Sequence, residues 1–161
     1  MKAYVMYESK TGNTKKLADT IKKYYRDRDC TALGLDDADV VFEGSWTDKG
    51  HIADAMAEKV SRLKEKKVFI FGTCGYASDE YYKQVAEMSA RALTSGSKMI
   101  GYFYCQGEMP ISVRQKYEAS LSENAEDIHM QVALENFDMA IGHPNQDDLD
   151  RLVKVLDELK A

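Results

Sequence analysis

Short apolar runs alternate with longer amphipathic segments along most of the chain, and this alternation predicts its architecture. Four of the runs are rich in β-branched or aromatic residues, as buried strands are. A fifth run is weaker and predicts a strand at the edge of a sheet. The expected strands are AYVMY at 3–7, CTALGL at 30–35, DVVFEG at 39–44, KVFIFGT at 67–73 and MIGYFYC at 99–105.

Between these runs, apolar side chains recur every three or four residues, which is the spacing of one helix face. Asn145 is a good N-cap for the last helix, and Asp147 and Asp148 are placed to meet its dipole. Helices are expected at 14–25, at 52–63, at 81–93, at 115–138 with a break near SEN (122–124), and from 145 onward.

Strands that alternate with helices predict an α/β fold with a parallel sheet covered on both faces. About five strands and no internal linker or repeat predict a single domain over residues 1–161. Residues 106–144 exceed what a return to the last helix needs, so an extra helical segment is expected there. Ligands of such sheets bind beyond the carboxyl ends of the strands. Function is therefore sought in the loops at 8–14, 44–50, 72–79 and 105–110.

The loop after the first strand has the composition of a phosphate cradle. Residues 9–14 read SKTGNT and lead directly into a helix, whose free N–H groups and dipole favour an anion. Hydroxyl and amide groups add donors, and Gly12 lets the backbone come close to a ligand. Neither a Walker pattern nor a G-x-G-x-x-G fingerprint is present, so a monophosphate is favoured over a triphosphate or NAD. A polar turn with a Ser/Thr helix cap is the plainer alternative.

Two aromatic residues follow the next strands of the predicted sheet. Trp46 lies in GSWTDKG, and Tyr76 lies in GTCGYASDEYY. An aromatic side chain among small residues at a strand end can cover a flat ring while backbone groups reach the ring's edge. Capping of the sheet edge is the alternative for each, but two such residues beside a phosphate cradle favour a ring-shaped ligand.

Charge and cysteine usage narrow the classes of function. The net charge of −5 argues against nucleic acid and against anionic membranes as partners. The N-terminus has too few apolar residues for a secretion signal, and no stretch is apolar enough to span a bilayer. Three dispersed cysteines suit a reducing cytoplasm, and the scattered histidines suggest no metal. We therefore expect a cytoplasmic protein, and a monomer.

At these loops the sequence resembles the flavodoxin family. SKTGNT is similar to the family's phosphate loop, and WTDKG resembles a W-x-D-K-G second loop of small bacterial flavodoxin-like proteins. The resemblance implies a three-layer, doubly wound, five-stranded parallel sheet of order 2-1-3-4-5 with FMN bound noncovalently. By this resemblance Tyr76 would stack on the flavin. The implied FMN-binding residues are Ser9, Lys10, Thr11, Gly12, Asn13 and Thr14 at the phosphate, Ser45, Trp46, Thr47 and Asp48 on one side of the ring, Thr73, Cys74, Gly75 and Tyr76 on the other, and Gln106 and Gly107 beside it.

The resemblance implies a small electron carrier between a reductase and an acceptor protein, without catalytic residues of its own. Two alternatives remain at this point: a small FMN-dependent reductase of a quinone- or pigment-like acceptor, and a binding module without flavin. Lys49 departs from the acidic second loop of many flavodoxins. If it points inward, it would stabilise an anionic reduced flavin; if it points to solvent, it has no such effect.

Overall fold

The structure is a computed structural model that describes residues 1–159. The strands are β1 (Ala3–Tyr7), β2 (Val40–Asp48), β3 (His51–Ile52), β4 (Lys67–Cys74) and β5 (Lys98–Gln106). The helices are α1 (Asn13–Arg26), α2 (Asp54–Ser61), α3 (Asp79–Ala90), α4 (Ile111–Glu123), α5 (Ile128–Ala140) and α6 (Gln146–Glu158).

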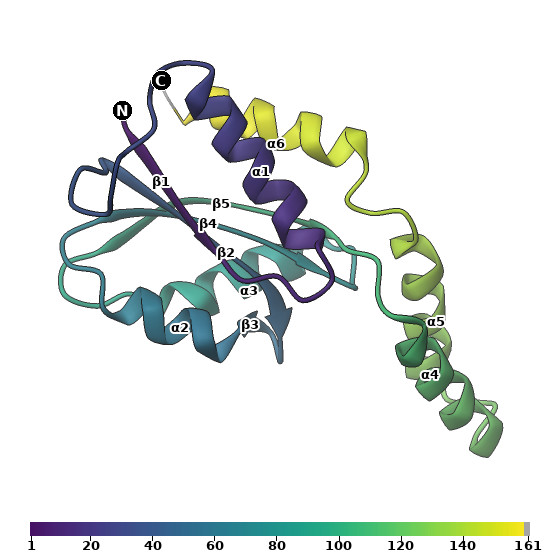
Figure 1. The fold of residues 1–161 in the computed structure, drawn as a ribbon. Helices are drawn as coiled ribbons and strands as arrows, with labels where there is room; N and C mark the ends of the chain where they lie inside the picture. The colour runs from purple at the N-terminus through teal and green to yellow at the C-terminus, as the bar shows by residue number, and fades with distance from the viewer. Residues whose placement is uncertain (160–161) are drawn as a thin grey trace.

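Four strands form a parallel sheet in the order β1-β2-β4-β5, and helices cover both of its faces. Helices α1 and α6 lie on one face, and α2 and α3 lie on the other (Figure 1). The fifth strand, β3, pairs antiparallel with the end of β2. The prediction of a three-layer α/β fold with a parallel sheet is therefore confirmed.

The strand predicted at residues 30–35 is not formed, so the order 2-1-3-4-5 is met only in part. This segment makes a single parallel bridge, between Thr31 and Ala3, at the outer side of β1. The Ala32 N–H donates to the Ala3 carbonyl at 2.9 Å, and the chain then turns away toward β2. Leu33 is almost fully exposed, so the alternating burial that would hold a longer strand is lacking.

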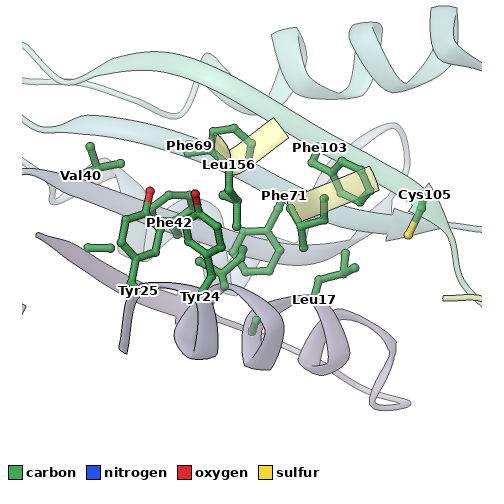
Figure 2. Packing of buried hydrophobic residues seen from close by; sticks show 14 residues of the cluster. Leu17, Tyr24, Tyr25, Val40, Phe42, Phe69, Phe71, Phe103, Cys105 and Leu156 are labelled. Carbon is green, nitrogen blue, oxygen red and sulfur yellow. The ribbon is translucent and has the colours of Figure 1, made fainter. Parts of the chain in front are cut away.

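The core facing α1 and α6 is aromatic. Figure 2 shows Tyr25, Phe42 and Phe69 in a row between α1 and the sheet. Neighbouring ring centroids in this row are 5.2 Å apart and the rings are tilted, a favourable arrangement for aromatic pairs. Leu17 of α1 and Leu156 of α6 are fully buried against the same cluster. The stripes predicted for the first and last helices therefore face the sheet.

The core facing α2 and α3 contains an unexpected carboxyl group. Glu43 of β2 is fully buried, and neither carboxyl oxygen has a hydrogen-bond partner among residues 1–159. It lies on the same sheet face as Val41, within a cluster of apolar side chains from α2, α3 and β4. Burial raises the pKa of Glu43 to about 8, so its neutral form is favoured near neutral pH.

The predicted N-cap of the last helix is confirmed and forms a reciprocal capping box. The Asp148 N–H donates to Asn145 Oδ1 at 3.1 Å, and the Asn145 N–H donates to Asp148 Oδ2 at 2.9 Å. Burial alone would raise the pKa of Asp148, but hydrogen bonds from the Asn145 N–H, Arg151 and His143 outweigh it and lower the pKa. The buried carboxylate therefore joins the first turn of α6 to the segment that precedes it.

Residues 106–144 form a helical hairpin that projects from one end of the sheet (Figure 1). The predicted break near SEN is confirmed, because α4 ends at Glu123 and α5 begins at Ile128. The two helices pack mainly on each other. Among the described residues, no helix is both long and apolar enough to cross a membrane.

Candidate functional site

A cavity of about 340 Å³ lies where the parallel strands end, at the edge of the sheet that the fold class predicts. Four separate segments of the chain meet there: the loop after β1, the end of β2, the end of β4 and the segment after β5. The cavity is lined by eleven of the sixteen predicted site residues, namely Ser9, Lys10, Thr11, Asn13, Thr14, Trp46, Thr47, Thr73, Cys74, Gly75 and Gly107. Gly12, Ser45, Asp48, Tyr76 and Gln106 do not line it.

The loop after β1 places a residue without a side chain at the N-cap of α1. Gly12 occupies the N-cap position with φ +89°, a left-handed conformation that glycine adopts without strain, and it offers no side chain to the helix. Ser9 Oγ accepts hydrogen bonds from the Gly12 N–H at 3.1 Å and the Lys15 N–H at 3.3 Å, which folds the loop back on itself. The remaining N–H groups at the start of α1 lack intrahelical partners. The loop can therefore hold an anion.

Asn13 and Thr14 tie this loop to the neighbouring segments. Asn13 Nδ2 donates to the Glu108 carbonyl at 2.8 Å, so its amide joins the first loop to the segment after β5. The Thr14 hydroxyl is buried and lies 3.4 Å from the Thr73 hydroxyl at the end of β4. These contacts fix the spacing of three walls of the cavity.

The prediction that residues 44–50 form a loop is wrong, because residues 44–48 belong to strand β2. β2 continues to Asp48, and the turn consists of Lys49 and Gly50, with φ values of +50° and +85°. Positive φ at both central residues is typical of the tight turns that join antiparallel strands, here β2 and β3. Lys49 is exposed at this turn, in keeping with the solvent-facing alternative.

Trp46 and Thr47 are the residues of β2 that reach the cavity. Lys10 Nζ lies 4.5 Å from the centroid of the Trp46 ring, a cation–π distance. The hydroxyl oxygen of Thr47 is buried without a hydrogen-bond partner among residues 1–159. Ser45 instead faces the core, where its Oγ accepts from the Ala53 N–H at 3.1 Å.

The loop after β4 presents backbone and small side chains to the cavity. Burial raises the pKa of the Cys74 thiol to about 12, and its Sγ donates to the Tyr76 carbonyl at 3.3 Å. This thiol is therefore protonated near neutral pH and is no nucleophile. The Tyr76 ring is 45% exposed and meets the Tyr81 ring edge-on with centroids 5.6 Å apart.

The segment after β5 closes the cavity. Gln106 is buried, and its Nε2 donates to the carbonyls of Gly75 at 3.0 Å and Asn136 at 3.3 Å, so its role here is to hold two segments together. A Cβ at Gly107 would lie 2.9 Å from Asn13 Nδ2, which shows how closely this backbone approaches the first loop. Met109, Pro110 and Val113 form an apolar wall of the cavity and were not predicted individually from the sequence. Their only sequence signal was their position after the last strand.

Polar groups of the cavity are mostly neutral, apart from Lys10 and Glu108, whose carboxylate accepts a hydrogen bond from the Gly142 N–H. Within the described residues, no cluster of three or more His, Cys, Asp or Glu side chains could hold a metal ion. The lining combines the hydroxyl and N–H donors of the first loop with an indole, a thioether and aliphatic groups. Such a site suits an anionic group joined to a flat organic ring.

Comparison with known proteins agrees with this architecture. The profile described as "Flavodoxin domain" matches residues 4–157. A flavodoxin-like domain-containing protein BilS of Clostridioides difficile is 32% identical over 161 aligned residues, and one of Clostridium symbiosum is 27% identical over 172. Each alignment covers 92% of this chain and 90% of the relative. The solved flavodoxin of Streptococcus pneumonia TIGR4 covers 88% of this chain and is itself covered completely, with a TM-score of 0.50 and 17% identity, a likeness of fold. The chain belongs to the flavodoxin family.

Proposed function

We propose that this protein binds FMN noncovalently in the cavity at the carboxyl ends of the strands and carries electrons between a reductase and an acceptor protein. Membership of the flavodoxin family supports a flavin-binding electron-transfer role. The observation that carries the finer proposal is the joint lining of one cavity by the SKTGNT loop, Trp46 and the segments after β4 and β5.

The residues present fit FMN on three counts. The N-cap residue Gly12 supplies no side-chain cap, and the N–H groups of the first turn of α1 that Ser9 does not engage remain as donors for a phosphate. Thr47 lines the cavity beside Trp46, so its side chain could contact an edge of the ring system. Trp46, Met109 and Val113 supply apolar surface for the isoalloxazine.

FMN, when bound, would supply the redox chemistry. The chain's residues have three tasks in this proposal. The N–H groups of the first loop and the hydroxyls of Ser9 and Thr11 hold the phosphate. Trp46 and the apolar wall exclude water from one part of the ring. Lys10, which lies over Trp46, adds a positive charge at the cavity that favours negative charge on a bound ligand.

Binding measurements on the apoprotein test the cofactor assignment. Titration with FMN and with riboflavin, followed by quenching of flavin fluorescence, should show FMN binding at least about tenfold more tightly because riboflavin lacks the phosphate. Thr11→Asp should remove this preference by charge repulsion while leaving riboflavin binding nearly unchanged. Thr31→Asp, at an exposed position next to β1, is the matched control. Equal affinity for the two flavins in the unmutated protein would refute the phosphate assignment.

Turnover measurements distinguish the carrier from the enzyme. The purified, FMN-loaded protein should not oxidise NAD(P)H without an added reductase. Steady oxidation of NAD(P)H with a quinone or tetrapyrrole acceptor, and no reductase, would instead support the small FMN-dependent reductase.

A further inference from the structure

The segment 106–144, which contains the helical hairpin of α4 and α5, carries the whole net charge of the protein. Residues 106–144 hold seven acidic and two basic residues, which gives −5, the value for the entire chain. The remaining 122 residues hold 20 acidic and 20 basic residues and are neutral in sum. Because the hairpin projects from the end of the sheet (Figure 1), this charge is concentrated on an arm rather than spread over the surface.

The outer face of α5 carries three exposed apolar side chains. Ile128, Val132 and Met139 follow a spacing of four and seven residues, which places them on one side of the helix. Their exposed fractions are 69%, 36% and 58%, and Glu135 lies on the same face. Five of the nine exposed large hydrophobic residues described in the structure belong to residues 106–144: Ile111, Ile128, Val132, Met139 and Ile141.

The inner faces of the two helices are joined by contacts of Arg114 and Phe137 that do not involve the outer face. Arg114 of α4 pairs with Glu118 and, across the hairpin, with Asp138, and its guanidinium lies 5.5 Å from the Phe137 ring centroid. Phe137 is buried, and Ile128, Val132 and Met139 point away from that side of α5. The outer apolar face thus remains free for another molecule.

The base of the hairpin is fixed to the cavity. The Ala77 N–H donates to Asn136 Oδ1 at 3.4 Å, which joins the middle of α5 to the loop that carries exposed Tyr76. The Glu108 N–H donates to the His143 carbonyl at 2.8 Å, and the Gly142 N–H donates to Glu108 Oε2 at 3.0 Å. A molecule seated on α5 would therefore be held next to the cavity.

We propose that the outer face of α5, with its centre at Ile128, Val132 and Met139 and its acidic surroundings, is the docking surface for a positively charged redox partner protein. This inference rests on the proposed electron-transfer function. The negative charge of residues 106–144 argues for a positively charged occupant. A second copy of the chain would bring a second segment of net charge −5, and the two segments would repel each other. An anionic lipid surface would repel the segment in the same way. A basic protein with an apolar contact region would complement both the negative charge and the exposed apolar side chains of α5.

Electron transfer to two acceptors of different charge tests the docking surface. The FMN-loaded protein is reduced with dithionite and mixed in a stopped-flow instrument with ferricytochrome c, a strongly basic protein, or with neutral benzoquinone. The variants are Ile128→Ser with Met139→Ser, and Glu126→Lys with Glu135→Lys. The matched control is Glu87→Lys with Met88→Ser, which changes an exposed acidic and apolar pair on α3.

Both hairpin variants should lower the second-order rate constant with cytochrome c at least about fivefold at low ionic strength, and the charge variant should also weaken the salt dependence. The α3 control should retain the original rate, and all proteins should reduce benzoquinone equally. If the hairpin variants reduce cytochrome c and benzoquinone at the original rates, the docking surface is overturned. The proposed function would still stand in that case, because electrons are still transferred. Absence of FMN binding and of reduction of either acceptor would overturn both. A dimer in sedimentation velocity that the Ile128 and Met139 substitutions dissociate would overturn the docking surface in favour of self-association.

Discussion

Replacing Glu43 with glutamine should remove a large part of the pH dependence of this protein's stability. Glu43 is fully buried in the core under α2 and α3, and its two carboxyl oxygens lack partners among residues 1–159. Burial raises its pKa from 4.5 to about 8. Glutamine has nearly the same shape and does not ionise, so Glu43→Gln isolates the contribution of the proton.

The direction of the pH dependence follows from which state of the chain, folded or unfolded, keeps the proton of Glu43. Between the unfolded and folded pKa values, the folded chain keeps a proton that the unfolded chain has lost. The stabilisation is present at acidic pH and declines as the pH rises toward 8, by up to about 1.4 kcal/mol per pH unit. For these two pKa values the loss in the free energy of unfolding is about 2.5 kcal/mol from pH 5 to pH 7 and about 4 kcal/mol from pH 5 to pH 9.

Urea unfolding followed by circular dichroism at pH 5, 6, 7, 8 and 9 measures this loss. The difference in unfolding free energy between the original protein and Glu43→Gln should change by about 2.5 kcal/mol between pH 5 and pH 7, with glutamine favoured at the higher pH. Glu123→Gln at an exposed position of α4 is the control and should give a curve parallel to the original. If the curve of unfolding free energy against pH for Glu43→Gln is also parallel to that of the original protein, the raised pKa of Glu43 is refuted, and with it the argument that burial raises it.

Three further predictions concern the core, the last helix and the cavity. Leu152→Ala, at a fully buried position of α6, should lower the free energy of unfolding by about 2–5 kcal/mol in urea titrations, and a loss below about 1 kcal/mol would contradict its place in the core. Asn145→Ala should cost about 1 kcal/mol in thermal unfolding because the capping box is lost, and an unchanged midpoint would contradict that role. Gly107→Ala places a Cβ 2.9 Å from Asn13 Nδ2 and should weaken FMN binding about tenfold with the far-ultraviolet spectrum preserved, whereas Gly34→Ala, in open space, should leave affinity unchanged.

The sequence predicted those elements whose local signals agree with their surroundings. The run AYVMY is the strand Ala3–Tyr7, and the stripe from Leu17 to Tyr25 is the buried face of α1. Asn145 caps α6 as expected because a cap depends on residues within one turn. The eleven predicted residues around the cavity also meet in space, since parallel strands bring their carboxyl ends to one edge.

The predictions from sequence failed where contacts between residues distant in the chain decide the structure. Residues 30–35 have strand-like composition, but Leu33 finds no buried surface and one bridge at Thr31 is all that forms. Residues 44–48 look like a loop because all but Trp46 are small or polar, yet they extend β2 by pairing with β3 and β4. The burial of Glu43 has no local signature either, because a lone carboxyl residue in an apolar run is also compatible with an exposed edge.

The unequal division of charge between the arm and the neutral body makes the molecule an electric dipole whose negative pole lies on α4 and α5. In the field of a cationic protein such a dipole experiences a torque before contact, and the arm turns toward the approaching surface. Screening limits this effect to about 8 Å at physiological ionic strength, so charges on a projecting element act earlier in an encounter than charges on the body. The molecule can thus arrive already aligned, which raises the productive fraction of brief collisions without a requirement for tight association.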